Sequence, residues 1–426
     1  MTALATVARA PLTLNRKYLA PAVFILFGLV DILVFGFFAH KGDATFALAL
    51  PGASVHVPSI HAPAATVSYI LGAVSILLGA AWATVEESRL FKRLSIGLVL
   101  LFFVISLLCW SDTGSWANGI PVNVVSLLQN TLTSSIPLIL GALAGCMGER
   151  SGVINIAIEG QLLIGAFTAA VITSAVGGLF LGLISGSLAG GLVGLILGLF
   201  AIRFLVDQII LGVVLNLLIS GLTGYLYDRL LVPNANTYNS ATTFSALKIP
   251  GLGDIPVIGP IFFDSTIFLY LTYAAIVAVQ VGLFSTRRGL RVRAVGEHPT
   301  AADTVGIKVL GIRYGNVIMG GMLAGIGGAY LTIGSVGTFS KDMSSGLGYI
   351  ALAAMIFGRW TPLGGTLAAL LFGFTEALSS FMGSITVPIS PYLLGMLPYV
   401  ATIIAVAGLV GRVRAPAADG KPYLRS

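Results

Sequence analysis

The chain has 426 residues, of which 57% are hydrophobic and only 9% are charged, and its mean hydropathy is strongly positive. Soluble domains carry about 25% charged residues, so this composition excludes a soluble globular protein, which needs a polar surface. The formal net charge of +7 would suit a nucleic-acid-binding protein, but the positions of the basic residues explain it by membrane topology, and no nucleic-acid partner is expected.

Long apolar runs follow one another along most of the chain, as in Leu19–Phe38, Leu94–Trp110 and Ile267–Leu283. Strands of a membrane barrel alternate apolar and polar residues over about ten positions, whereas continuous runs of about twenty form helices, because lipid offers the backbone no other hydrogen-bonding partner. The sequence therefore predicts an all-α polytopic membrane protein with about 12 transmembrane helices, a core of about ten preceded by two N-terminal spans. The expected spans are residues 19–38, 67–85, 94–110, 124–147, 156–176, 179–202, 208–227, 267–285, 314–334, 346–358, 363–382 and 393–410.

The distribution of lysine and arginine gives the orientation, because cytoplasmic loops of membrane proteins are enriched in these residues. With the N-terminus inside, only Lys41, Arg229, Lys248 and Lys341 of the 23 basic residues fall outside. Both termini are therefore expected to be cytoplasmic, in a protein of the inner or plasma membrane of the cell. The run 346–358 is too short to cross comfortably and is expected to be a half-helix buried in protein.

Three sections are expected along the chain: an N-terminal extension with two transmembrane helices at residues 1–93, a transmembrane core at 94–411, and a polar cytoplasmic tail at 412–426. The tail is expected to be disordered. No catalytic set or metal site is expected, because the two cysteines lie in apolar segments and no set of histidines, cysteines and acids clusters along the sequence. The string GxxxxGK followed by Ser or Thr, which marks a phosphate-binding loop, is also missing, so any ATP chemistry must take place on another chain.

The segment from Gly148 to Gln161, GERSGVINIAIEGQ, is unusually polar for a link between two apolar runs. Its Glu159 falls inside the second of these runs, where an ionised carboxylate is costly unless it is paired or faces water. The side chain is therefore expected to face the interior of the helix bundle. Two interpretations stay open: an ordinary inner turn whose Glu159 ties helices together, or a break inside the membrane that lines a pathway.

A second polar segment, RVRAVGEHPTAADTVGI at Arg291–Ile307, lies in the long inner loop. Pro299 suits the first turn of a helix and Gly306 can end one, so a short helix along the membrane surface is predicted. Its arginines could anchor it to lipid headgroups, or it could be a docking helix for a cytoplasmic motor.

A third segment, ALAAMIFGRWTPLGG at Ala351–Gly365, breaks a helix at Pro362 and the glycine pair. Polar residues inside the other spans mostly hydrogen-bond to neighbouring helices, and Asp31 is expected to serve in pairing or assembly. The residues expected to line a polar pathway are Asn155, Glu159, Asn216 and Glu376.

These three strings resemble the motifs of one transporter superfamily. The second is similar to RAxGENPxAAxxxGI, found in permeases of ATP-binding-cassette (ABC) importers of the branched-chain amino acid and simple-sugar permease superfamily. The first resembles GERSGVINIGxEG, the signature of the nucleoside-type branch, and the third resembles LAAxIxGxxxPxG. The chain departs from these motifs at Ala157, where Gly is usual, and at His298, where Asn is usual. The resemblance covers residues 94–411.

The resemblance implies that the chain is the transmembrane permease subunit of an ABC importer, not an enzyme, and that it moves nucleosides by alternating access. The expected partners are a separate cytoplasmic ATPase, a second and paralogous permease subunit, an extracellular substrate-binding lipoprotein and the lipid bilayer. No cofactor is expected in this chain, since the ATPase partner uses the ATP. The ATPase-coupling loop implied by the motif consists of Gly296, Glu297, His298, Pro299, Ala301, Ala302 and Gly306.

Two alternative functions stay open beside this one. The chain could be an ABC permease for simple sugars or other small polar solutes. It could also be a proton-coupled secondary transporter with Glu159, Glu376 or Asp31 as the proton carrier, although the docking motif argues against that function.

Overall fold

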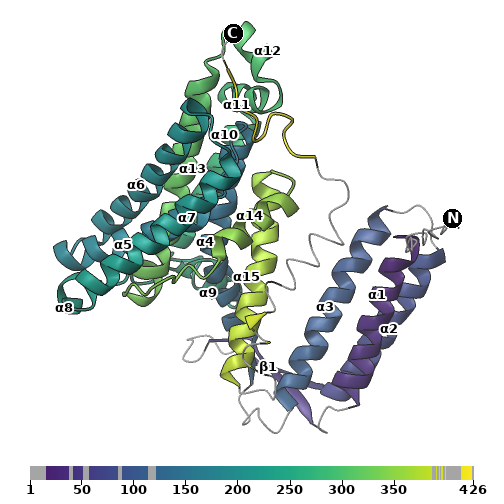
Figure 1. Ribbon diagram of the computed structural model, residues 1–426. Coiled ribbons are helices and arrows are strands. Elements are labelled where there is room, and N and C mark those ends of the chain that lie inside the picture. The colour runs from purple at the N-terminus through teal and green to yellow at the C-terminus, as the bar shows by residue number, and fades with distance from the viewer. Residues whose placement is uncertain are drawn as a thin grey trace, which may run out of the picture. The chain divides into compact units, whose positions relative to one another are not determined.

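Figure 1 shows the computed structural model, which describes residues 16–37, 42–50, 57–84, 89–113, 121–385 and 414–424, and also Ser390, Leu393, Gly395, Met396 and Tyr399. Contacts divide the chain into two compact units. The first comprises residues 1–124 and 382–389, and the second comprises residues 125–381 and 390–426.

The first unit is built on three apolar helices. Helix α1 (Arg16–Val30) continues through a π-helical turn, η1 (Asp31–Gly36), and packs against α2 (Ala64–Thr84), which in turn packs against α3 (Arg89–Thr113). Helix α3 therefore lies in this unit, although the sequence counted it with the core that begins at residue 94. A functional division of the chain at residue 93 stays a prediction.

A small sheet completes the first unit. Strand β1 (Asp43–Ala47) lies between β2 (Ile60–Pro63), which is antiparallel to it, and β3 (Val122–Asn123), which is parallel to it. The amide of Asn123 also donates a hydrogen bond of 2.7 Å to the carbonyl oxygen of Ala49. The sheet therefore ties the connection between α1 and α2 to the chain just before the second unit.

The second unit holds the remaining long helices, linked by short helices and turns. The long elements are α4 (Val124–Arg150), α5 (Ile158–Val176), α6 (Leu179–Gly198) with η2 (Leu199–Arg203), α7 (Gln208–Leu226) with η3 (Tyr227–Leu231), α10 (Ile267–Phe284), α13 (Val309–Leu331) with η4 (Thr332–Val336), and α15 (Pro362–Ser384). The short elements are α8 (Ala235–Tyr238), β4 (Leu247–Lys248), α9 (Ile258–Phe262), β5 (Asp264–Ser265), α11 (Arg287–Glu297), α12 (Pro299–Thr304) and α14 (Leu347–Phe357).

The helices confirm an all-α polytopic membrane protein. Within the described residues, nine helices are long and apolar enough to cross a membrane, and Pro21–Gly36 and Leu347–Phe357 are shorter apolar helices. The predicted span at 393–410 falls almost entirely outside the described residues. The total of about 12 spans and the cytoplasmic position of both termini stay predictions.

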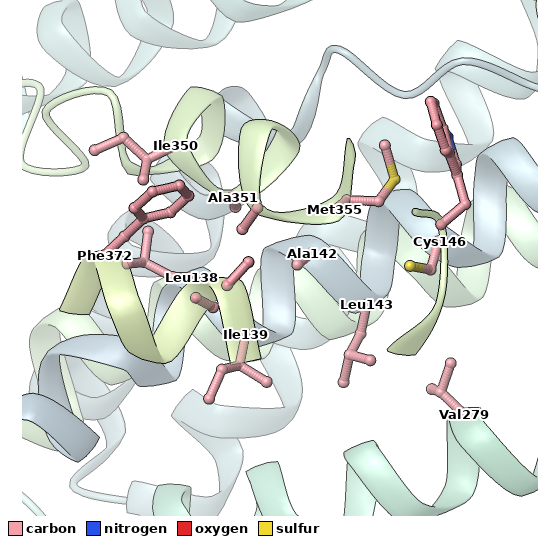
Figure 2. Packing of buried hydrophobic residues seen from close by; sticks show 14 of the residues in the cluster. Leu138, Ile139, Ala142, Leu143, Cys146, Val279, Ile350, Ala351, Met355 and Phe372 are labelled. Carbon is pink, nitrogen blue, oxygen red and sulfur yellow. The ribbon is translucent and has the colours of Figure 1, made fainter. Parts of the chain in front are cut away.

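One core of the second unit lies between α4, α10, α14 and α15 and holds the short helix α14 in place. Figure 2 shows Leu138 and Ala142 of α4 near Ala351 of α14, and Phe372 of α15 belongs to the same cluster. Cys146 is buried in this cluster as a free thiol, as the sequence predicted.

Glycines set the closest helix contacts of the second unit, between α13 and its neighbours α5 and α6. A Cβ atom added at Gly328 would lie 1.9 Å from the carbonyl oxygen of Leu162, and one added at Gly190 would lie 2.3 Å from that of Gly321. Backbones pack this closely only where small residues line both helices. Glycine at these positions is therefore required by the close packing of the helices.

We expect Gly328→Leu to destabilise the protein strongly, because the added side chain must push α5 away from α13. Overpacking of this kind costs about 1–3 kcal/mol or more. The control is Gly221→Leu on α7, where an added Cβ meets no atom within 4 Å. Thermal midpoints in detergent should fall by several degrees for Gly328→Leu only, and equal midpoints for the two variants would refute this account of the packing.

Candidate functional site

The link between α4 and α5 is a break buried in protein. The backbone N–H groups of Ser151 and Val153 both donate to the carbonyl oxygen of Gly148, at 3.0 and 3.1 Å. Gly152 then takes a left-handed conformation with φ +88°, which turns the chain. The side chains of Ser151, Val153 and Ala157 are wholly buried. This burial shows that the segment packs against other parts of the protein, while a role in lining a pathway stays a prediction.

Side-chain amides satisfy the polar groups of this break. Asn155 and Gln161 are both buried, and each donates an amide hydrogen bond to the other, at 3.0 and 3.3 Å. The backbone N–H of Ile154 donates to Oε1 of Gln208 at 2.8 Å. Buried backbone groups need such partners where no helix supplies them, so the polar character of the segment has a structural cause.

Asn216 lies on α7 and hydrogen-bonds both to the end of the break nearest α5 and to α14. Its Oδ1 accepts the N–H of Gly160 at 2.8 Å, and its Nδ2 donates to the carbonyl oxygen of Ile156 at 2.9 Å and to the hydroxyl of Tyr349 at 3.1 Å. Asn216 lies eight residues after Gln208, the first residue of α7, which is about 12 Å along a helix. The break therefore runs alongside the first two turns of α7.

Glu159 caps the half-helix α14. Its Oε1 accepts hydrogen bonds from the Ser344 hydroxyl at 2.6 Å and the Gly346 N–H at 2.9 Å, and its Oε2 accepts from the Gly348 N–H at 2.7 Å. A carboxylate is favourable at a helix N-terminus, where free N–H groups and the helix dipole are positive. Helix α14 has 11 residues, about 16 Å, so the predicted half-helix is confirmed. Glu159 therefore ties helices together, as the inner-turn interpretation proposed. It does so next to the break between α4 and α5, which is the feature on which the other interpretation rests.

Sequence reasoning missed Ser344 and Tyr349, which complete this arrangement. The signal available for them was Gly346 and Gly348, since a Cβ at Gly348 would lie 2.5 Å from Cα of Glu159. Such close backbone contact favours glycine. The pairing of a carboxylate with this glycine-containing turn joins segments almost two hundred residues apart, which no local pattern reveals.

The remaining pathway candidate, Glu376, is placed apart from this cluster. It lies on an exposed part of α15, and its side chain takes no part in the network around Glu159 and Asn216. Asp31 lies in the π-helical turn of the first unit and is fully buried. The structure thus groups Asn155, Glu159 and Asn216, whereas their use by a substrate stays a prediction, as does that of Glu376.

We expect a cysteine at position 151 or 157 to resist a membrane-impermeant maleimide applied from the cytoplasmic side, because Ser151 and Ala157 are wholly buried. The control is Val305→Cys, since Val305 is 73% exposed just after α12. Labelling of Ser151→Cys or Ala157→Cys as fast as Val305→Cys would contradict the buried break. The native Cys109 and Cys146 are buried and should contribute little background.

The predicted short helix is present as α12, in the long connection between α10 and α13. Pro299 occupies its first turn, and Nδ1 of His298 accepts the N–H of Ala301 at 3.3 Å. Gly306 follows with φ +82°, the left-handed conformation that commonly ends a helix. His298 therefore performs the capping contact that Asn usually makes, which explains why this departure from the motif is compatible with the same helix.

The tail was expected to be disordered, and for residues 414–424 this expectation is wrong. The Ala418 N–H donates to the carbonyl oxygen of Gly296 at 2.9 Å, and Nη1 of Arg313 donates to that of Lys421 at 3.0 Å. Tyr423 is buried in a cluster that includes Ala302 of α12. The proline and glycine residues of the tail form turns that place its apolar side chains against the coupling loop, which composition alone does not show.

Two carboxyl groups meet where the tail reaches the end of α4. Glu149 accepts a hydrogen bond from the indole N–H of Trp360 and is also hydrogen-bonded to Asp419. Burial raises the pKa of Asp419 from 3.8 to about 7, against the opposing effects of hydrogen bonds from Glu149 and the Gly420 N–H and of the positive charge of Arg313. The contact between tail and helix is therefore sensitive to protonation.

This raised pKa predicts that stability falls as pH rises. Between the unfolded pKa of 3.8 and the folded value of about 7, the folded protein holds a proton that the unfolded chain has lost, so the stabilisation decreases over that window. The thermal midpoint should fall between about pH 5 and pH 7 and level off above. Asp419→Asn, which cannot ionise, should show a flatter profile, and identical profiles would contradict the assignment.

A polytopic helical protein with a buried helix break, a capped half-helix and a surface helix is compatible with a membrane permease. The chain belongs to the family described as branched-chain amino acid transport system / permease component, whose model matches residues 127–406. It is therefore a transport subunit and a multi-pass membrane protein, not an enzyme. Permease components of transport systems work with other subunits, so an ATPase and a further permease partner are implied.

Curated relatives agree with this family. The guanosine ABC transporter permease protein NupQ of Bacillus subtilis is 41% identical over 322 residues, which cover 71% of this chain and 98% of the relative. The nucleoside ABC transporter permease protein NupC of Lactococcus lactis is 38% identical and covers 72% and 100%. The putative glucose ABC transporter permease protein TsgC13 of Haloferax volcanii is 34% identical and covers 62% and 80%. No solved structure shows significant similarity to the chain.

Proposed function

We propose that the chain is the permease subunit of an ABC importer for nucleosides in the inner or plasma membrane of the cell. The observation that carries this substrate is the similarity to two relatives named for guanosine and nucleosides, which match over 98% and 100% of their own length. The groups around the break are compatible with it, because the amides of Asn155, Gln161 and Asn216 and the hydroxyl of Tyr349 are uncharged, as are nucleosides. The carboxylate of Glu159 is occupied by Ser344, Gly346 and Gly348.

The mechanism proposed is alternating access driven by ATP on a separate chain. The ATPase would push on the coupling loop around α12, which touches the end of α4 through Gly296: a Cβ there would lie 2.2 Å from the carbonyl oxygen of Arg150. Arg150 in turn donates hydrogen bonds to the carbonyl oxygens of Trp360 and Arg359, just after α14. Motion of the loop therefore reaches both the break and the half-helix.

The partners of this proposal are an ATPase, a second permease subunit and an extracellular substrate-binding lipoprotein. Bacillus subtilis and Lactococcus lactis each contribute a second relative named as a permease of the same kind, the guanosine permease NupP and the nucleoside permease NupB, which supports a paralogous partner. The exposed carboxylate of Glu376 is compatible with such a partner, because a carboxylate exposed on a membrane helix requires either water or a partner surface.

Uptake competition tests the substrate. Cells that lack their own nucleoside uptake would express the full importer, and uptake of radiolabelled guanosine would be measured against excess unlabelled adenosine, glucose or leucine. Competition by adenosine alone is the expected result. Absence of saturable guanosine uptake, together with saturable uptake of radiolabelled glucose, would replace the nucleoside by the sugar alternative that the relative from Haloferax volcanii suggests.

A further inference from the structure

The stretch between η4 and α14 runs back into the second unit along α7. Nζ of Lys341 pairs with Asp228 of η3 at 2.6 Å, and Oδ1 of Asp342 accepts a hydrogen bond from the Ser220 hydroxyl at 2.5 Å. Helix α14 then meets α7 at Asn216. These contacts follow α7 from its far end toward the break, so the stretch descends from the side opposite the coupling loop.

The stretch ends, just before α14, in a turn whose backbone is left-handed at three positions: Asp342 at φ +51°, Ser345 at φ +44° and Gly346 at φ +83°. Asp342 and Ser345 are exposed. A charged carboxylate exposed only four residues beyond Asn216 along α7, at Ser220, must face water or a partner surface, because lipid would not tolerate it. The turn is therefore expected to lie away from the bilayer, where water or a partner subunit can meet it.

Two tyrosines flank the same turn with their rings open. Tyr349 and Tyr399 are each 47% exposed. A Cβ at Gly346 would lie 3.5 Å from the Tyr399 hydroxyl and 3.9 Å from Cδ2 of Tyr349. Each hydroxyl is held, since Tyr399 donates to the carbonyl oxygen of Ser345 at 3.0 Å and Tyr349 accepts from Asn216. Each tyrosine is thus anchored through its hydroxyl while about half of its surface stays exposed.

We propose that this turn is the nucleoside-binding site, in which the rings of Tyr349 and Tyr399 stack on the base and the carboxylate of Asp342 accepts hydrogen bonds from the ribose hydroxyls. Aromatic rings bind bases of any type by stacking, and a carboxylate held in place by Ser220 suits a vicinal diol, which offers two O–H donors. The assignment rests on the proposed function and specifies where its substrate binds.

Base recognition is tested with Tyr349→Ala and Tyr399→Ala in the complete importer, with radiolabelled guanosine as the probe. The KM for uptake should rise by about tenfold in each variant, because stacking on one aromatic ring is worth about that factor. Tyr349→Phe keeps the ring but removes the hydroxyl that accepts from Asn216, so its KM should rise less than that of Tyr349→Ala. The matched control is Tyr225→Ala, since Tyr225 is also an exposed tyrosine, 60% exposed, on α7 and is not one of the residues proposed to bind the nucleoside.

Ribose recognition is tested with Asp342→Asn, because asparagine tolerates the left-handed backbone. The KM for guanosine should rise by about tenfold, while that for 2′,3′-dideoxyguanosine, which lacks both hydroxyls, should not change. Equal effects on the two substrates, or an unchanged KM for guanosine in both tyrosine-to-alanine variants, would overturn the site. Absence of guanosine uptake by the wild-type importer would instead refute the proposed function, which keeps the two failures distinct.

Discussion

Replacement of Glu159 by alanine is expected to abolish uptake and to lower the thermal midpoint of the protein. The change leaves the Ser344 hydroxyl and the N–H groups of Gly346 and Gly348 without their acceptor. A buried polar group that loses its partner costs about 1–3 kcal/mol, and three such groups meet at one helix end. Helix α14 should therefore lose its position at the break.

Glu159→Gln separates the cap from the charge. Glutamine keeps one oxygen acceptor but turns an N–H₂ donor toward a group that also donates, so an intermediate loss is expected. The control is Asp254→Asn, because Asp254 forms an exposed ion pair with Lys248 and surface pairs contribute little stability. A wild-type thermal midpoint in detergent for Glu159→Ala would show that Glu159 does not support α14.

Changes in the coupling loop should separate ATP hydrolysis from transport while leaving the fold intact. An added Cβ at Gly306 meets no atom within 4 Å, so Gly306→Trp adds a bulky group on an open surface and costs only about 1–2 kcal/mol for its left-handed backbone. Glu297→Arg reverses the charge beside α12, where Glu297 accepts the Ala417 N–H at 3.3 Å. Both changes should disturb the surface around α12 on which the ATPase is expected to dock.

We expect uptake to fall by about tenfold or more in Gly306→Trp and Glu297→Arg, a loss typical of a broken coupling between sites. ATP hydrolysis by the purified complex and the thermal midpoint should stay near wild type. Gly306→Asn is the matched control, since asparagine accepts the left-handed conformation at low cost. Normal uptake in both test variants would remove the coupling assignment of α12.

The fold followed from sequence wherever the signal was local. Continuous apolar runs predicted the long helices, and the short run at 346–358 predicted the half-helix. Pro299 and Gly306 predicted the two ends of α12. The shift at α13, which begins at Val309 and not at 314, is a typical boundary error, because the helix starts in the polar loop before its apolar run.

The features that sequence could not give depend on contacts between distant segments. Glu159 was expected to face the bundle interior, but its partners Ser344, Gly346 and Gly348 lie far along the chain. Tyr423 is one aromatic residue in a polar tail, and only the folded loop shows the apolar pocket that buries it. The family motifs marked the polar segments in the sequence, but they did not show which residues those segments contact in the fold.

The most direct test of the central claim is guanosine uptake by proteoliposomes that contain the purified importer, with ATP supplied on the side of the coupling loop. The account predicts that an ATPase and a second permease co-purify with the tagged chain in mild detergent. It also predicts accumulation of radiolabelled guanosine that requires ATP and persists when the proton gradient is collapsed. Uptake by the chain alone, independent of ATP and lost with the proton gradient, would contradict it and identify a proton-coupled transporter.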